Sequence, residues 1–201
     1  MITYMIAGFE TTSSALSWFI YGMSKHPHVQ RKLKAEVKGE HGRCDLSAEN
    51  LDSFVYLDCV INEIFRYYPP TELVARTLIA DDRLPDSGTQ LYSGERVMLP
   101  NCVVSKDPQL WSIDPERFYP ERFLTDDKNF HPYAFLPFGA GHRSCIGQDL
   151  ARLEFKIIAA RLMQYVTFGD GGPEVNAGGH IEGLTSMPKK VGVTIEFDQD
   201  E

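Results

Sequence analysis

The sequence has few cysteines, and none follows the spacing of a metal finger or a disulfide framework. The four residues Cys44, Cys59, Cys102 and Cys145 lie far apart, and no CxxC pair occurs among them. A zinc finger therefore finds no support. Four cysteines in 201 residues are also too sparse for a small disulfide-stabilised scaffold. We interpret the chain as one whose thiols stay reduced and face the cytosol.

An excess of basic residues is absent as well. The 20 lysines and arginines are outnumbered by 28 aspartates and glutamates, which gives a formal net charge of -8. Proteins that bind nucleic acid carry a basic footprint, so this balance argues against nucleic acid as a partner. The sequence also contains no internal repeats and no low-complexity tract.

The sequence lacks an uninterrupted hydrophobic run long enough to cross a bilayer. The segment that approaches one reads MITYMIAGFETTSSALSWFIYGM and occupies residues 1–23. A membrane span needs about 20 apolar residues, and Glu10 and the Thr/Ser cluster would be costly in lipid. We therefore predict a helix over residues 2–24 that is buried in the centre of a protein rather than in a membrane.

What the chain does contain is a helical pattern with a few short strands. Hydrophobic periodicity predicts helices over 2–24, 28–38, 54–68 and 146–166, and strands over 73–80, 95–104 and 191–197. Gly39 and Gly42 would end the second helix. Between the strand predicted at 95–104 and the helix predicted at 146–166, residues 105–137 form a long stretch rich in Pro, Asp and Phe. A loop of that length is usually functional. Histidines in polar surroundings are predicted at the surface: His26, His28, His41, His131 and His180.

One cysteine stands in a glycine-rich segment, FGAGHRSCIG, over residues 138–147. Cys145 precedes a predicted helix, and a thiol near a helix N-terminus favours its thiolate form. Gly139, Gly141 and Gly147 allow tight turns and the close approach of a flat, bulky ligand. Arg143 offers a planar cation for a carboxylate. A buried thiolate, space and a cation together predict an axial site for haem iron, with the arginine on a propionate; the alternative is a structural cysteine on a glycine-rich turn.

The first helix carries AGFETT over residues 7–12. Small Ala7 and Gly8 leave a gap, and Glu10 and Thr11 place an acid and a hydroxyl beside it. Such a pair can relay protons to a bound oxygen species. A Thr/Ser-rich kink, in which hydroxyls bond back to the helix, explains the same residues and stays open.

The segment EIFR places Glu63 and Arg66 three residues apart on one apolar helix. A pair in that setting is buried and needs further partners. Two PERF segments supply candidates, Arg122 and Arg117, which would lock the helix to the long loop. Arg76, after the Pro-Pro break, is either a second propionate contact or a strand-edge cation.

In order and approximate separation, AGFETT, EIFR, PERF and FGAGHRSCIG resemble the C-terminal part of a cytochrome P450, a haem-thiolate monooxygenase. The resemblance spans nearly the whole chain and is closest to eukaryotic microsomal members. It implies a mainly α fold with small β-sheets, here as one partial domain over residues 1–201 whose N-terminal half is missing. The cysteine-loop motif is highly specific, whereas ExxR alone is weak.

The resemblance also implies roles for individual residues. Cys145 would be the axial iron ligand, Arg143 and Arg76 the propionate contacts, and Glu10 with Thr11 the proton-delivering pair. Phe138 would pack beside the thiolate, and Gly147 would belong to the cofactor-binding loop. Glu63, Arg66 and Arg122 would form the family's buried structural triad. Substrate contacts would come from Ile6, Ala7, residues 71–75 and the turn near Leu184, and a redox-partner face from Arg152 and Lys156.

The function implied is insertion of one oxygen atom from O2 into an apolar organic substrate such as a lipid, sterol or xenobiotic. Haem b would be the cofactor, and electrons would come ultimately from NADPH through a reductase. The parent protein would be anchored to the endoplasmic reticulum membrane, on its cytosolic face, by the missing N-terminal segment. Two alternatives remain: a truncated, non-catalytic remnant that binds a partner, and a haem-thiolate isomerase or dehydratase.

Overall fold

A computed structural model of the chain describes residues 2–39 and 45–199, so Cys44, and the predictions made for His41 and Gly42, lie outside the described residues. The helices are α1 (Ile2–Lys25), α2 (Pro27–Lys38), α3 (Ala48–Ser53), α4 (Val55–Tyr67), α5 (Asn101–Val104) and α6 (Gln148–Tyr165), with short 3-10 helices η1 (Pro120–Leu124) and η2 (Gly141–Arg143). The strands are β1 (Val74–Thr77), β2 (Asp82–Arg83), β3 (Gln90–Leu91), β4 (Arg96–Leu99), β5 (Val166–Asp170), β6 (His180–Glu182), β7 (Ser186–Pro188) and β8 (Val193–Phe197).

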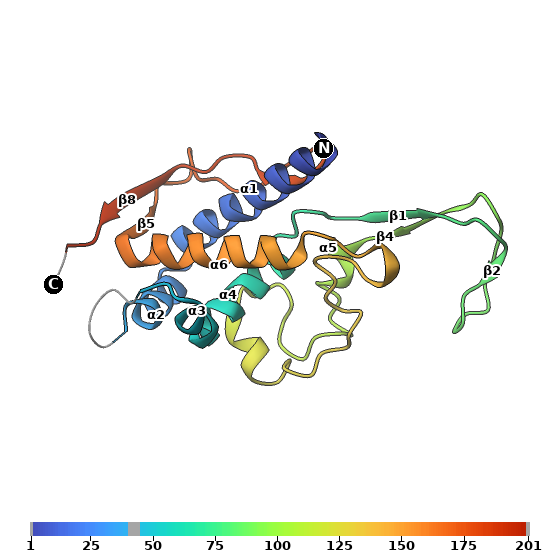
Figure 1. The fold of residues 1–201 in the computed structure, drawn as a ribbon, viewed down its shortest axis with the longest axis horizontal. Coiled ribbons are helices and arrows are strands. Elements are labelled where there is room, and N and C mark those ends of the chain that lie inside the picture. The colour runs from blue at the N-terminus through green and yellow to red at the C-terminus, as the bar shows by residue number, and fades with distance from the viewer. Residues whose placement is uncertain (1, 40–44, 200–201) are drawn as a thin grey trace.

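The strands form four separate two-stranded antiparallel sheets, β1 with β4, β2 with β3, β5 with β8 and β6 with β7. Figure 1 shows β1, β4 and the β2–β3 hairpin extending away from the helices, while β5 and β8 lie at the opposite end. The prediction of a mainly α fold with small β-sheets is confirmed.

The core lies between α1, α2, α4 and α6. Phe19 of α1 meets Phe155 of α6 edge to face, with ring centroids 5.7 Å apart. Phe155 also contacts Phe65 of α4, at 5.4 Å. Leu33 of α2 and Leu57 of α4 are fully buried in the same cluster. Each such side chain contributes about 1.5–3 kcal/mol through burial, so this cluster fixes α6, which directly follows residues 138–147, against α4.

The predicted central helix is present, but only its second half is buried. α1 covers Ile2–Lys25, and its buried residues lie between Ser14 and Ser24. The expectation of burial along the whole helix is wrong for the first turns, where Phe9 is 77% exposed, because none of the described elements packs over them. Among the described residues, no helix is both long enough and apolar enough to cross a membrane.

Local sequence signals misplaced one strand and missed others. The strand predicted over 95–104 ends at Leu99, because Pro100 stops it and Asn101–Val104 forms the short helix α5 instead. The pairs β2–β3 and β6–β7 were not predicted, since strands of two or three residues carry too little periodicity to be recognised. The final predicted strand is confirmed as β8.

His26 departs from its predicted surface position. Its ring stacks on Phe118 with centroids 4.4 Å apart, at the start of α2. Burial, with a smaller contribution from the neighbouring His28, lowers the pKa of His26 from its ordinary value of 6.5 to about 4. The folded chain therefore holds this imidazole neutral at pH values where the unfolded chain protonates it.

We expect the chain to lose stability as the pH falls from about 6.5 to about 4, because the unfolded state binds a proton at His26 that the folded state excludes. Allowing for partial exposure, the loss is roughly 1 kcal/mol. Urea unfolding across this window should show a flatter pH dependence for His26→Phe, which keeps the stacking ring and has no titrating group. Identical pH dependence in the two proteins would contradict this assignment.

Candidate functional site

The segment 138–147 folds into a tight loop immediately before α6. The backbone N–H of Cys145 donates to the carbonyl of Phe138 at 2.9 Å, and that of Ser144 donates to Gly141 at 3.1 Å. Gly139 and Gly141 adopt φ values of 71° and 69°, a region that residues with a side chain rarely occupy. The glycines are therefore needed for the backbone turns that present the thiol.

The thiol of Cys145 lies on the wall of an open cavity of about 500 Å³. The cavity is lined mainly by apolar groups from α1, α4, the segment before β1, the cysteine loop and the start of α6. The expectation of a buried cysteine is wrong for this structure: Cys145 is exposed because this side of the cavity is open. A thiol in such a position is accessible to a ligand that enters the cavity.

Two arginines reach the same cavity without a carboxylate partner among the residues that the structure describes. Arg76, on β1, donates to the carbonyl of Ala75 at 2.9 Å, and Arg143, in η2, has no ion pair in the described part of the chain. Glu154 of α6 also lines the cavity but pairs with neither of them. Haem is a flat metal macrocycle with two carboxylate groups. The cavity offers it an accessible thiol for the metal, apolar walls for the ring and two arginines for the carboxylates, so these residues fit haem.

The acid and the alcohol of α1 occupy different environments. Thr11 lines the cavity, and its hydroxyl donates to the carbonyl of Ala7 at 2.6 Å. Glu10 accepts a hydrogen bond from the hydroxyl of Thr185 at 3.3 Å. The structure therefore brings Thr11, but not Glu10, to the cavity wall next to Ala7. The back-bonded hydroxyl that the sequence left open is observed, and α1 stays one continuous helix.

Of the residues predicted to meet substrate, some line the cavity and others do not. Ala7, Thr71 and Val74 belong to its wall. Ile6 is exposed on α1, and Leu184 is exposed in the turn between β6 and β7. The wall that the structure describes is therefore formed by one face of α1 and by the segment that leads into β1.

The sequence of this chain matches known proteins over most of its length. Residues 1–193 match the family model for cytochrome P450. The chain belongs to the cytochrome P450 family. It is 34% identical over 175 residues to cytochrome P450 4d2 of Drosophila melanogaster, covering 86% of this chain and 34% of that protein. It is 36% identical to mouse cytochrome P450 3A16 over 169 residues, covering 83% of this chain and 33% of that protein.

A third relative, rat cytochrome P450 4V2, is 38% identical over 165 residues, or 81% of this chain and 31% of that protein. The chain thus spans about a third of the length of the curated relatives it matches. Membership of the cytochrome P450 family implies haem as the cofactor that this fold binds.

The buried ion-pair network of this cytochrome P450 chain centres on Glu63. Its carboxylate accepts hydrogen bonds from Arg66 Nε at 2.8 Å and Nη2 at 2.9 Å, and from the backbone N–H of Tyr119 at 2.7 Å. Arg122 Nε lies 3.2 Å from the same carboxylate. All three charged side chains are fully buried. The structure therefore brings Glu63, Arg66 and Arg122 together, the three residues that the family resemblance implied as a buried triad.

The arginines use their remaining donors to hold the long loop. Arg66 Nη1 donates to the carbonyls of Ser105 and Pro115, each at 2.9 Å. Arg122 Nη1 pairs with Asp127 at 2.9 Å, a buried acid that sequence reasoning missed because nothing in its neighbourhood distinguishes it from surface aspartates. Arg117, the competing candidate, is exposed and contributes only its backbone carbonyl, to both arginines.

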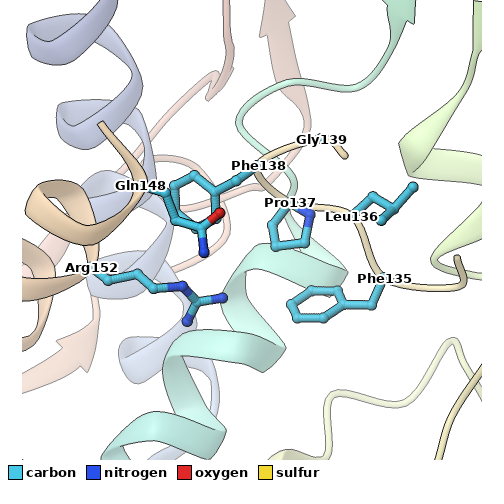
Figure 2. A pocket seen from close by; sticks show the side chains of 7 residues that line it. All are labelled: Phe135, Leu136, Pro137, Phe138, Gly139, Gln148 and Arg152. Carbon is cyan, nitrogen blue, oxygen red and sulfur yellow. The ribbon is translucent and has the colours of Figure 1, made fainter. Parts of the chain in front are cut away.

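Phe138 forms a wall between the main cavity and a smaller one of about 210 Å³. Its ring packs edge to face on Phe65 at 5.4 Å, and the guanidinium of Arg152 lies 5.1 Å from its centroid. Figure 2 shows Arg152 and Gln148 of α6 lying across this smaller cavity from Pro137 and Phe135. Phe138 is thereby held between α4 and α6, directly beside the backbone that carries the thiol.

The two cations predicted to face a redox partner are both half-buried. Arg152 donates to the amide oxygen of Asn62 at 3.1 Å, and burial lowers its pKa below the ordinary value. Lys156 forms an ion pair with Asp58 at 2.8 Å. Both side chains thus tie α6 to α4. A partner that docked there would find both cations already bound to residues of α4.

Proposed function

We propose that this chain carries the haem and oxygen site of a monooxygenase that inserts one oxygen atom from O2 into an apolar organic substrate such as a lipid, sterol or xenobiotic. The observation that carries the proposal is one apolar cavity that holds the Cys145 thiol, two arginines without acid partners and the Thr11 hydroxyl. The family match supports the cofactor, and the cavity lining supports the class of substrate.

In this proposal the protein's own residues bind and orient the cofactor. Cys145 would ligate the haem iron, and Arg76 and Arg143 would hold the two propionates. Gly147 also lines the cavity, and a Cβ built on it would lie 4.0 Å from Cys145 Sγ, which places this residue directly beside the thiolate. Phe138 packs beside the ligand. Bound haem supplies the activation of O2, which the electron density donated by a thiolate favours.

The remaining residues exclude water and deliver protons. Ala7 and Val74 line the cavity with apolar surface, which keeps bulk water from the reacting oxygen. Thr11 offers its hydroxyl at the cavity wall, and it must rotate away from the Ala7 carbonyl to donate elsewhere. Glu10 immediately precedes Thr11 on the same helix, and it would return a proton to the Thr11 hydroxyl once released from Thr185.

The overall reaction consumes O2, NADPH and a proton. One oxygen atom enters the substrate as a hydroxyl group, and the other leaves as water with the two electrons and two protons delivered. The electrons reach the site through a reductase docked on the cysteine side. The resemblance to microsomal members supports a location on the cytosolic face of the endoplasmic reticulum membrane.

An isotope experiment tests this proposal. The haem-loaded chain is given 18O2, NADPH, a reductase and an apolar substrate, and the product is analysed by mass spectrometry. The proposal predicts one 18O atom per product molecule. The position of Glu10 outside the cavity favours the alternative, a haem-thiolate isomerase or dehydratase, which needs no proton relay. Such an enzyme would form no product under these conditions, and it would convert an added peroxide substrate into product without 18O from O2. A chain that binds no haem would support the non-catalytic remnant.

We expect Thr11→Ala to lower the yield of product per O2 consumed by roughly 10- to 100-fold, because a positioned proton donor contributes rate enhancements of that order or more. The reducing equivalents should instead appear as hydrogen peroxide. Ser13→Ala is the matched control, since Ser13 makes a similar back-bond, to Glu10 at 3.1 Å, without lining the cavity. Equal coupling in the two variants would contradict the role of Thr11.

A further inference from the structure

Three side chains that can bind a metal converge outside the haem site. They are Glu72, from the segment before β1, and His180 and Glu182, from β6. His180 Nε2 lies 3.5 Å from a carboxylate oxygen of Glu72 and 3.4 Å from one of Glu182. One ligand atom from each residue falls within 4.8 Å of the other two.

The fold holds these residues together through backbone contacts. His180 and Glu182 are two residues apart on one strand, so their side chains share a face of the β6–β7 hairpin. Opposite Glu182 in the ladder lies Ser186, whose N–H donates to the carbonyl of Pro70 at 2.8 Å. Glu72 lies two residues after Pro70, and its backbone carbonyl accepts a hydrogen bond from the N–H of Cys102 at 3.0 Å. The hydrogen bond between Ser186 and Pro70 therefore holds the hairpin beside the segment that carries Glu72.

We propose that Glu72, His180 and Glu182 bind a divalent transition metal of the zinc class, with water completing the coordination. In a tetrahedral site with bonds of about 2.0–2.1 Å, neighbouring ligand atoms lie about 3.3 Å apart. The two distances from His180 are within 0.2 Å of that value. The imidazole in the set favours zinc, cobalt or nickel over calcium or magnesium, which prefer oxygen alone.

The site bridges two segments that are far apart in the sequence. Glu72 lies between Thr71 and Val74, both of which line the haem cavity, and the β6–β7 hairpin packs on α1. Bound metal would cross-link the hairpin to the segment that leads to Arg76 on β1. Its binding would therefore stabilise the folded chain by mass action and hold one wall of the cavity in place.

The test is a Co2+ and Zn2+ titration of the full chain in a Cys145→Ser background, so that the exposed thiol cannot serve as a ligand. We expect one equivalent of Co2+ to give the visible absorption bands of a four-coordinate site, and Zn2+ to displace it. In calorimetry, His180→Ala and Glu182→Gln should each weaken Zn2+ binding by about 100-fold or more, since even outer residues of metal sites contribute 10–100-fold. The Glu182 side chain is 76% exposed, so this variant stays folded.

His28→Ala is the matched control. His28 is exposed and lies beside His26, and among the described residues these two neighbouring imidazoles are an alternative place for the metal to bind. It should leave the affinity unchanged. Zinc at a hundredfold excess over Kd should raise Tm by roughly 5–10 °C in the parent and not in Glu182→Gln. The proposal is overturned if no metal binds, if His180→Ala and Glu182→Gln bind as tightly as the parent, or if His28→Ala abolishes binding.

Discussion

Replacing Arg122 with alanine is expected to lower the free energy of unfolding by about 3–5 kcal/mol, the usual cost of removing one partner from a buried ion pair. The substitution leaves the buried carboxylates of Glu63 and Asp127 each short of a cation. It also removes the donors that hold the carbonyls of Ile113 and Asp114, at 3.0 and 2.9 Å. Urea unfolding followed by circular dichroism measures the change.

The chain supplies its own control for this prediction. Arg117 occupies the same place in the first PERF segment, but its side chain is exposed and stacks on Tyr119. Its contribution to the network is a backbone carbonyl, which survives substitution. Arg117→Ala should change stability by no more than about 0.5 kcal/mol. Equal losses in the two variants would show that the buried network does not depend on Arg122.

The second large effect is expected at the two arginines of the cavity. A hydrogen bond between charged groups contributes about 1.5–3 kcal/mol, which corresponds to roughly 10- to 100-fold in affinity. Arg76→Ala and Arg143→Ala should each accelerate haem loss by about that factor, and the double variant by the product, because neither arginine has an acid partner in the described structure. The rate of haem transfer to an excess of another apo haem protein measures the effect.

Arg83→Ala provides the comparison. Arg83 lies in the exposed β2–β3 hairpin, where its guanidinium donates to Gly88 and Gln90 and takes no part in the cavity. Haem loss should be unchanged in this variant. A double variant of Arg76 and Arg143 that retains haem as long as Arg83→Ala would contradict the assignment of both residues to the propionates.

The buried network explains how the protein places its cysteine loop. Glu63 and Arg66 are three residues apart on α4, and through Arg122 they fix backbone carbonyls between Ser105 and Arg117. A long loop without regular structure gains fixed geometry only when its polar groups find such partners. This loop leads to Phe138, which lies between Phe65 and Arg152 at the start of the segment that carries the Cys145 thiol.

Features that depend on neighbouring residues in the sequence could be predicted. The glycine turns before Cys145 require local backbone freedom, and Glu63 with Arg66 requires only helical spacing, so both were identified from the sequence. The choice of Arg122 over Arg117 came from family resemblance, since the two PERF segments are locally almost identical. Asp127 was missed because its burial depends on how the loop folds back to bring the backbone N–H groups of Ser112 and Ile113 to its carboxylate, which no short motif encodes.

Burial and side-chain contacts that depend on distant parts of the chain could not be predicted from a local stretch of sequence. The apolar first turns of α1 suggested a fully buried helix, yet burial depends on which elements pack there. The exposure of Cys145 has the same origin, because the motif determines the turn and not how closed the cavity is. The position of Glu10 depends on Thr185, 175 residues away, so neighbouring Glu10 and Thr11 could not be told apart from the sequence.

We propose that Cys145 is the thiolate ligand of a haem held in this cavity. The most direct measurement is the carbon monoxide difference spectrum of the reduced, haem-supplied chain, recorded beside Cys145→Ser and Cys59→Ser. Cys59 is buried on α4, away from the cavity, and burial raises its pKa to about 11. We predict a strongly red-shifted Soret band that is lost in Cys145→Ser alone. A haem-bound chain with an unshifted band, or a shifted band that survives in Cys145→Ser, would contradict the claim.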